Sequence, residues 1–494
     1  AEAVFRGVLD AQPDNTEFYA VYGSAMQTIG RYEAAVKAYR KALDMRFSDA
    51  GGIYENMGAA LCMQGKYQES IETFDAALKL EPDNARTHSS LLLTLHYLAG
   101  QDPESILERH RRWPGNALSP SPRALRARPS GRPERLRIGY VSSDFRKHSV
   151  AYFVEPLLAL HDASRYEITC YFAHKDADDT TRHLQQLAHR WRDVADLDDR
   201  QLLQMIANDG IDILVDLNGH TSGGRLTAFA RRAAPVQVSF IGYPDTTGVT
   251  EMDYRLSDAI ADPPGAERLC TESLYRLPDC FLCYQAPEDA PAVVQTPWEK
   301  NGFITFGSFN NLAKINAEVI DLWAGLLREV PDSRLVIKNP SLTDKATRER
   351  YQASFAKAGI PGERIDLVGF IADAAGHLGA YGRMDIALDT FPYNGTTTTC
   401  EALWMGVPVI TLRGDRHSAR VGASLLTAAG HPEWIADTPE QYLAIARDLA
   451  QDTGRLAQLR AGLREQLSVS LLCSAEPYVK AVEAAYDEMI TAAT

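Results

Sequence analysis

The sequence predicts an α/β protein with an all-α N-terminal part, in which helical repeats precede two Rossmann-like, doubly wound domains. Two similar helical segments begin at residues 30 and 65, and this recurrence predicts the repeats. From residue 135 onward, short apolar stretches alternate with helical ones, as in parallel α/β units. The chain has 494 residues, more than one hydrophobic core usually supports, so we expect several domains.

The repeat consists of GRYEAAVKAYRKALDM (30–45) and GKYQESIETFDAALKL (65–80). Small residues let two helices cross closely, and aromatic residues fill the groove between them. The pattern resembles the tetratricopeptide repeat, with about 34 residues per helix pair. The residues in register are Gly23/Gly58, Gly30/Gly65, Tyr32/Tyr67, Ala35/Ser70, Tyr39/Phe74, Ala42/Ala77 and Phe47/Pro82.

The first residues match the second half of this repeat, at Ala1, Phe5, Val8 and Pro13, and the chain starts without Met. We therefore expect the array to start in mid-repeat, with further chain upstream or a trimmed end. Residues 111–135 are rich in Pro, Ser and Arg, which indicates a solvated connector packed by Trp113 in preference to a basic binding arm.

Composition excludes several classes of protein. The formal net charge of -14 argues against nucleic acid as the main partner, because a phosphate-tracking surface is normally basic. No apolar run approaches the length of a membrane span, and residues 1–20 hold no signal-peptide core, so we expect a cytoplasmic protein. The seven cysteines are scattered, which favours reduced core thiols over disulfides. Cys280 and Cys283 form a CxxC without a second pair nearby, so core packing is preferred to a metal site.

Strands of the first α/β half are predicted in LRIGYVSSD, YEITCYFAH, IDILVDLNG and VQVSFIGYP. FITFGSFN, RLVIKN, RIDLVGF, DIALDTFPY and VPVITLRG form the second half, and WEKNG (298–302) separates the two. Ligands of doubly wound sheets bind at the carboxyl ends of the strands, where this sequence places its polar residues. The GxGxxG fingerprint is absent, which weakens a dinucleotide oxidoreductase interpretation.

Six motifs follow one another along the chain: LRIGYVSSDFRKHS, LVDLNGHT, IGYPDTTG, FGSFNNLAKI, MDIALDTFPYNGTTTTCEALWMGVPVIT and SARVGASLL. In this order they resemble the motifs of the protein O-linked N-acetylglucosamine transferases. With the repeats, the resemblance covers nearly the whole chain. It implies a GT-B glycosyltransferase, inverting and independent of metal or other cofactor, that moves N-acetylglucosamine from UDP-GlcNAc to Ser or Thr of proteins. Its partners would be protein or peptide acceptors, reached in part through the tetratricopeptide repeats, and its product UDP.

The resemblance implies five parts. They are residues 1–100, tetratricopeptide repeats; 101–134, linker and capping helix; 135–297, the N-terminal Rossmann-like half on the acceptor side; 298–475, the C-terminal Rossmann-like half on the nucleotide-sugar side; and 476–494, a C-terminal helix.

Three residues are candidates for catalysis: Lys314 and His148, which match active-site positions of the family, and Asp216, which stands at a predicted strand end. Charge develops on the leaving diphosphate oxygen, and without a metal the protein must supply a cation and oriented donors, a role that suits Lys314. His148 could take the acceptor proton or position sugar and acceptor, because imidazole titrates near neutral pH. Asp216 is either a base acting through solvent or an organiser of its loop.

The threonine run stands at a predicted helix start, where unpaired N–H groups and a partial positive charge attract phosphate. By resemblance, Thr396, Thr397 and Thr398 meet the diphosphate, although Thr396 replaces a family His. Glu401 stands where relatives carry an Asp that contacts ribose. The other nucleotide-sugar residues by resemblance are Asn310, Asn311 in place of a Gln, His377 near the uridine and the backbone around Ala372 at the uracil.

The sugar and acceptor pocket is expected to be shaped by Thr221, His220, Tyr243, Pro244 and Tyr393. Tyr393 replaces a small Cys of the family, and Ala374 stands where the family has a lysine near the uridine, so nucleotide or sugar selectivity could differ. The scaffold also resembles plant O-fucosyltransferases and bacterial N-glucosyltransferases, which leaves GDP-fucose or UDP-glucose open as donor and Asn as acceptor. A repeat scaffold with a non-catalytic transferase half is the remaining alternative.

Overall fold

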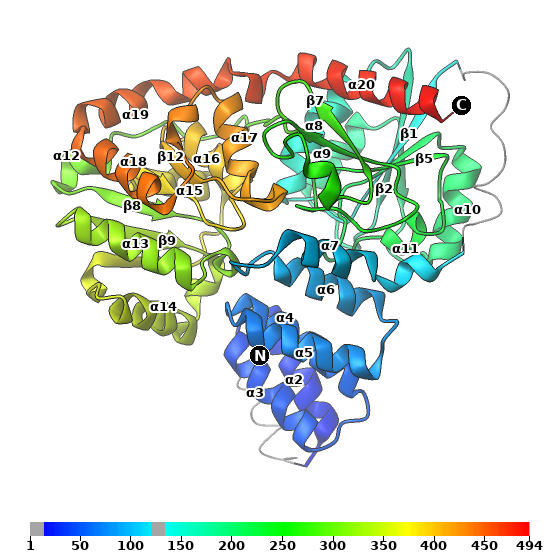
Figure 1. The fold of residues 1–494 in the computed structure, drawn as a ribbon, viewed down its shortest axis with the longest axis horizontal. Coiled ribbons are helices and arrows are strands. Elements are labelled where there is room, and N and C mark those ends of the chain that lie inside the picture. Colours follow the sequence, from blue (N-terminus) through cyan, green and yellow to red (C-terminus); the bar gives the residue numbers. More distant parts are fainter. Residues whose placement is uncertain (1–13, 120–133, 494) are drawn as a thin grey trace.

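A computed structural model describes residues 14–119 and 134–493. A helical N-terminal part lies below two α/β lobes that stand side by side, and a long C-terminal helix runs along the top (Figure 1). The half-repeat expected at residues 1–13 and most of the connector, residues 120–133, lie outside the described residues. The predicted fold class is confirmed.

The N-terminal part consists of paired helices. Four of them begin at an Asn or Asp whose side chain accepts the backbone N–H three residues on, at Asn15, Asp49, Asn84 and Asp102. The helices are α2 (Thr16–Thr28), α3 (Tyr32–Asp44), α4 (Ala50–Met63), α5 (Tyr67–Leu80), α6 (Ala85–Leu95) and α7 (Pro103–Arg111), followed by the short η1 (Pro114–Ala117).

The repeat glycines mark close helix crossings, as predicted. A Cβ at Gly23 would stand 2.4 Å from the ring of Tyr39, and one at Gly58 would stand 2.7 Å from the ring of Phe74. Only glycine leaves room for these rings, so the register of the sequence repeat is the register of helix packing. Trp113 is 2% exposed and its indole N–H donates to the carbonyl of Ala85 at 3.0 Å, which ties the start of the connector to α6.

The first lobe holds a seven-stranded, fully parallel sheet in the order β3-β2-β1-β4-β5-β6-β7. Helices cover both faces, as a parallel sheet requires. The strands are β1 (Leu136–Ser142), β2 (Tyr166–Phe172), β3 (Arg190–Asp193), β4 (Ile213–Asp216), β5 (Val236–Ser239), β6 (Tyr254–Asp258) and β7 (Ser273–Leu277). The helices are α8 (Ser149–Leu160), α9 (Asp179–Leu187), α10 (Asp199–Asp209), α11 (Leu226–Phe229) and η2 (Ala266–Leu269).

The second lobe holds a six-stranded parallel sheet in the order β10-β9-β8-β11-β12-β13. Its strands are β8 (Thr305–Ser308), β9 (Arg334–Lys338), β10 (Ile365–Val368), β11 (Ile386–Leu388), β12 (Val409–Leu412) and β13 (Ile435–Ala436). Its helices include α12 (Pro297–Asn301), η3 (Leu312–Lys314), α13 (Ala317–Glu329), α14 (Lys345–Lys357), α15 (Ala374–Gly379), α16 (Thr397–Trp404), η7 (His417–Ala419), α17 (Val421–Ala428), α18 (Pro439–Gln451) and α19 (Thr453–Ser468).

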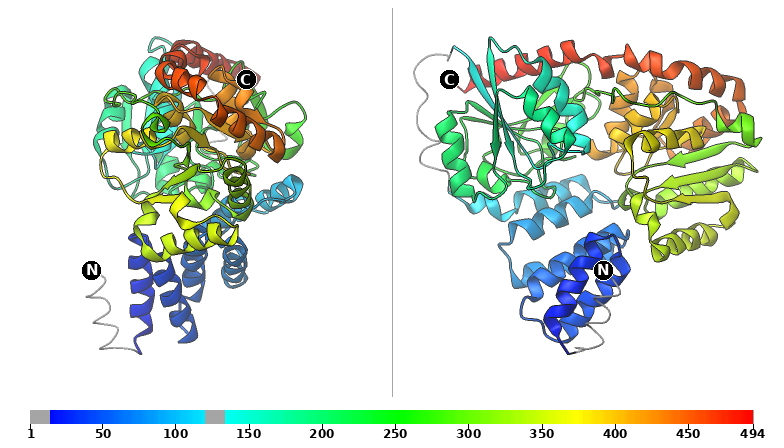
Figure 2. Two further views of the ribbon diagram at one scale, coloured as in Figure 1. Left: turned by 90° about the vertical axis from the view of Figure 1, so that its left-hand side faces the viewer. Right: turned by 180° about the vertical axis from the view of Figure 1, so that it is seen from behind.

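The last helix, α20 (Ala475–Ala492), returns from the second lobe to the first (Figures 1 and 2). The Tyr486 hydroxyl lies 3.1 Å from that of Tyr140, and Glu483 accepts from the His161 ring at 3.1 Å. The chain end therefore ties the two lobes together. No helix among the described residues is long and apolar enough to cross a membrane.

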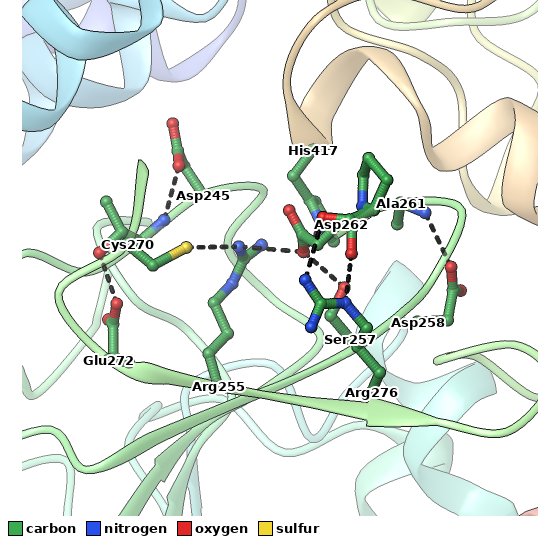
Figure 3. Close-up of polar contacts among 12 residues, drawn as sticks. Asp245, Arg255, Ser257, Asp258, Ala261, Asp262, Cys270, Glu272, Arg276 and His417 are labelled. Atoms are coloured by element: carbon green, nitrogen blue, oxygen red, sulfur yellow. Dashed lines mark hydrogen bonds and ion pairs between the residues drawn. The ribbon is translucent and has the colours of Figure 1, made fainter. Parts of the chain in front are cut away.

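A buried polar cluster joins the lobes on the side of the repeats. Figure 3 shows Asp262 between Arg255 and His417, with the Asp262 carboxylate 3.4 Å from the guanidinium and 2.7 Å from His417 Nδ1. Although burial opposes it, His417 and Arg255 hold the pKa of the Asp262 carboxyl well below its usual range. His417 belongs to η7 of the second lobe and the other two to the first, so the cluster fixes one lobe against the other.

All seven cysteines lie in the described part of the chain and are free thiols, six of them buried. Cys280 contacts the Ser424 hydroxyl at 3.3 Å and Cys283 lies in the large apolar core. The burial of six of them agrees with the expected packing in the core.

Candidate functional site

The candidate site lies where the strand-end loops of both lobes meet the end of the helical repeats. The ring of His96, the residue after α6, contacts Tyr243 of the first lobe at 5.7 Å and Tyr393 of the second at 6.5 Å between ring centroids. Tyr243 follows β5, and Tyr393 follows β11. Residues from three parts of the fold thus converge on one place.

Lys314 ends η3, beyond the carboxyl end of β8. Its ammonium donates to the carbonyl of Asn394 at 2.7 Å and stands 3.8 Å from the centre of the Tyr393 ring. Burial lowers its pKa to about 8, while the nearby Asp389 carboxylate acts in the opposite direction. Because the favourable contacts are a carbonyl and a ring face, the ammonium is available to an anion that reaches this loop.

The threonine run begins α16. Thr396 is the N-cap residue, with no capping bond from its side chain, and Thr398 Oγ1 donates to Asn310 Oδ1 at 2.9 Å. Thr397 is 8% exposed, and its hydroxyl has no hydrogen-bond partner. A buried hydroxyl without a partner is costly, and at a helix N-terminus it joins free backbone N–H groups. The arrangement suits an anionic ligand that would satisfy these donors together.

A buried carboxylate organises the threonine loop. Asp389, directly after β11, accepts the backbone N–H of Gly395 at 2.6 Å and the Thr411 hydroxyl at 2.7 Å, and lies 3.4 Å from the amide nitrogen of Asn310. Burial raises its pKa to about 6. Through Asp389, the ends of β8, β11 and β12 hold the start of α16 in place. Asn311 is exposed and caps η3 by accepting the N–H of Ala313 at 3.0 Å.

His377 and Glu401 come together across the site. His377 Nε2 lies 3.0 Å from Glu401 Oε2, which also accepts the Tyr381 hydroxyl at 2.8 Å. The other ring nitrogen, Nδ1, contacts the ammonium of Lys338, at the end of β9. Burial lowers the pKa of Lys338 to about 8, with Glu401 opposing. The predicted ribose carboxylate and uridine-side imidazole are therefore neighbours. Ala372 is exposed, two residues before α15.

His148 occupies the N-cap of α8, beyond β1. Its Nδ1 lies 3.6 Å from Asp144 Oδ2, and the side chain is 41% exposed. Burial lowers the His148 pKa, with Asp144 opposing, so the ring is mainly neutral at pH 7. Asn218 holds Asp144 by donating from its amide at 2.8 Å. His148 Nδ1 also accepts the backbone N–H of Val150 at 3.3 Å. A neutral imidazole can accept a proton, and it does so at Nε2 only in the tautomer that carries its hydrogen on Nδ1, toward Asp144.

Asp216 ends β4 and is 1% exposed. Its two oxygens accept the backbone N–H groups of Asn218 at 3.2 Å and Gly219 at 2.7 Å. Burial raises its pKa to about 6 despite these bonds. The contacts are those of a loop organiser, and proton transfer by Asp216 stays a prediction.

The predicted pocket residues of the first lobe are packed against the helical repeats. The Tyr243 hydroxyl lies between His110 Nε2 at 2.7 Å and His96 Nε2 at 3.2 Å, and Pro244 beside it is buried. His220 is held by Ser89 of α6 at 2.8 Å, and burial lowers its pKa to about 3. These contacts pack the repeat-end helices directly against the strand-end loops of the first lobe.

The loop NGHT, residues 218–221, packs closely against Tyr243. Gly219 has a φ of 57°, and a Cβ there would lie 2.3 Å from the Tyr243 Cβ, so both conformation and space require glycine. Thr221 next to it donates its hydroxyl to the carbonyl of Asn218 at 2.8 Å.

Among the described residues, one group offers metal-ligand chemistry: His96, His110 and Asp245, whose ligand atoms lie within 4.8 Å of one another. Burial lowers the pKa of both imidazoles, which keeps them neutral, but the Tyr243 hydroxyl already bonds both at the nitrogens that face the group. Hydrogen bonding accounts for the cluster.

Several residues of the site were not predicted. Asp389 and Lys338 stand at the ends of predicted strands, so their position was a signal that could have found them. Asp144 lies within a quoted motif, four residues before His148. Tyr97, His96 and His110 belong to the repeat end, and only helical apolar spacing marks that segment in the sequence.

The chain is similar to known proteins in sequence and in structure. The family model of glycosyl transferase family 41 matches residues 117–288 and 295–482, and a tetratricopeptide-repeat model matches residues 1–51 and 27–85. A solved structure of a Thermobaculum terrenum O-GlcNAc transferase mutant superposes with a TM-score of 0.93 at 39% identity, covering 100% of this chain and 94% of that one.

Two curated plant relatives, SPINDLY and SEC of Arabidopsis thaliana, are both named as probable UDP-N-acetylglucosamine–peptide N-acetylglucosaminyltransferases. SPINDLY is 41% identical over 416 residues, covering 83% of this chain and 46% of that protein. SEC is 32% identical over 380 residues, covering 74% and 38%. The chain spans about half the length of the curated relatives it matches.

Proposed function

Since the chain belongs to glycosyl transferase family 41, we propose that it is an inverting, metal-independent enzyme that moves N-acetylglucosamine from UDP-GlcNAc to Ser or Thr hydroxyls of proteins. The observation that carries the proposal is the buried, unpartnered Thr397 hydroxyl at the start of α16, in the loop whose Asn394 carbonyl binds Lys314. A diphosphate would satisfy these donors and the ammonium at once.

In this reaction the acceptor oxygen attacks the anomeric carbon on the face opposite the diphosphate. The bond from that carbon to the diphosphate oxygen breaks, and UDP leaves. Lys314, the Thr397 hydroxyl and the backbone N–H groups at the start of α16 stabilise the charge that grows on the leaving oxygen, an effect that speeds the step because it strengthens in the transition state.

The acceptor hydroxyl must also lose its proton. His148 suits this role better than Asp216, because its ring is partly exposed and mainly neutral at pH 7, whereas Asp216 is buried with both oxygens bonded. Glu401 and His377 would bind the ribose and uridine side of the donor. Inversion needs no covalent intermediate on the protein.

The variant Lys314→Ala tests the mechanism. We expect a large loss of turnover, because the ammonium acts where charge develops, while far-UV circular dichroism and the thermal midpoint stay near those of wild type. Lys357→Ala, at the end of α14, is the control and should leave turnover unchanged. Equal turnover of Lys314→Ala and wild type would refute the mechanism and favour a scaffold with a non-catalytic half.

A second donor is favoured by Tyr393. Its ring packs against Lys314 and stacks on Tyr97 at 5.4 Å, where the resemblance places a small Cys beside the sugar. A larger side chain there suits a sugar without an N-acetyl group, such as the fucose of GDP-fucose or the glucose of UDP-glucose. Thermal-shift titration with UDP and GDP separates the nucleotides, and stronger stabilisation by GDP would contradict the UDP assignment.

The proposal includes protein or peptide acceptors that reach the site through the tetratricopeptide repeats, and a cytoplasmic location. The acceptor part is supported by the position of the repeats, whose last helices contact the strand-end loops of the first lobe.

A further inference from the structure

Three tyrosines form a continuous aromatic stack from the helical repeats to Lys314. Tyr67, the first residue of α5, stacks on Tyr97 with 5.8 Å between ring centroids and 24° between planes. Tyr97, in the turn after α6, stacks on Tyr393 at 5.4 Å and 19°. The Tyr393 ring in turn lies 3.8 Å from the Lys314 ammonium. Two of the three rings thus come from the repeats.

The repeats also hold the backbone of the turn that carries Lys314. The Tyr67 hydroxyl donates to the carbonyl of Ala313, the residue before Lys314, at 2.5 Å. On the other side of Lys314, the Asn316 amide donates to the carbonyl of Tyr97 at 3.3 Å and to that of Phe391 at 2.9 Å. The residue before Lys314 and the residue two positions after it are therefore both hydrogen-bonded to tyrosines of the repeat end.

The side chains that make these contacts are buried together. Tyr67 is 5% exposed, Tyr97 is 8% exposed and Ala313 is fully buried, and together with Cys62 they form a small apolar cluster of their own. A lysine side chain carries large rotamer entropy, and rings packed on its neighbour restrict it. The Tyr393 ring, backed by Tyr97, covers the ammonium on this side.

We propose that Tyr97 and Tyr67 of the tetratricopeptide repeats are positioning residues for Lys314, so that the repeat end is part of the catalytic centre as well as a surface for acceptors. The inference rests on the proposed function, because it assumes that Lys314 meets a nucleoside diphosphate. Neither tyrosine touches the reacting atoms. Their effect is to restrict the conformation of the Lys314 side chain and to exclude water from its ammonium.

The test is the affinity of the full chain for UDP, and in parallel GDP, measured by isothermal titration from pH 7 to pH 9.5. In wild type the affinity should fall as the pH rises through about 8, because a neutral lysine cannot pair with the diphosphate. In Tyr97→Ala, water reaches Lys314, so this fall should move to higher pH. Affinity at pH 7 should drop about 2- to 12-fold, the cost of ordering one freed side chain.

Two further variants separate positioning from general stability. Tyr97→Phe keeps the ring. Its affinity for the nucleotide, and the pH at which that affinity falls, should equal those of wild type. Tyr39→Ala removes an equally large buried ring from the same repeats, in a cluster that contains no site residue, and should lower the thermal midpoint with no change in either quantity. Tyr67→Phe removes only the bond to Ala313 and should give a smaller loss than Tyr97→Ala.

The outcomes are distinguishable. If wild type binds UDP or GDP and Tyr97→Ala shows the same affinity and pH dependence, the inference is wrong while the proposed function stands. The inference also fails if Tyr39→Ala shifts the pH dependence as Tyr97→Ala does. If wild type binds neither nucleotide, the proposed function itself is contradicted.

Discussion

Thr397→Val should weaken the enzyme without weakening the fold. The change replaces a hydroxyl by a methyl group of nearly the same size, at a residue that is 8% exposed and whose hydroxyl has no partner. In the free protein, removing a buried hydroxyl without a partner loses no hydrogen bond. We therefore expect the thermal midpoint to stay the same or to rise.

Binding and turnover of the sugar nucleotide, in contrast, should be weakened. A hydrogen bond to a charged group contributes about 1.5–3 kcal/mol, which corresponds to about 10- to 150-fold in binding or rate. We expect kcat/KM for the sugar nucleotide to fall by this factor. Release of the nucleoside diphosphate, coupled to a colorimetric phosphate assay, measures it.

Thr73→Val is the matched control. Thr73 is also 8% exposed, but its hydroxyl donates to the Glu69 carbonyl at 2.6 Å within α5, away from the candidate site. This variant should keep kcat/KM. If Thr397→Val lowers the thermal midpoint and leaves kcat/KM unchanged, the assignment of its hydroxyl to the diphosphate is refuted.

Three more predictions follow from the site. The pH profile of kcat/KM should be bell-shaped, with activity lost above about pH 8 as Lys314 loses its proton, and lost on the acid side as the base gains one; a flat profile between pH 7 and 9.5 would contradict the role of Lys314. Asp144→Asn removes the carboxylate that raises the His148 pKa, so the acid limb should move to lower pH if His148 is the base and stay near 6 if Asp216 is. Dialysis against EDTA should leave turnover unchanged, and a loss that Mg²⁺ or Zn²⁺ restores would overturn metal independence.

Much of the fold could be predicted because its signals are local. The alternation of apolar strands and helices gave β1, β2, β4 and β5 in the first lobe and β8 to β12 in the second. β3, β6 and β7 were missed, since segments such as RWRD and SLYRL are polar or only half-buried and lack a continuous apolar run. β13 has two residues, too few for any pattern.

Some residues of the candidate site could also be predicted from local patterns, and others could not. Asn310 and Thr398 could be predicted as neighbours because both follow parallel strands whose carboxyl ends share one edge, and their side chains do bond. Glu401 lies one helical turn beyond the threonines, which the helix period predicts. Tyr97, His96 and His110 could not be predicted, because docking of a helical repeat on two lobes depends on tertiary packing that no local pattern records.

The most direct test of the account is intact-mass measurement of a generic peptide mixture, incubated with the full chain and each of UDP-GlcNAc, UDP-glucose and GDP-fucose in turn. The account predicts a gain of one N-acetylhexosamine residue on Ser- or Thr-containing peptides with UDP-GlcNAc, and no gain with Lys314→Ala. A hexose or deoxyhexose gain with another donor, and none with UDP-GlcNAc, would contradict it.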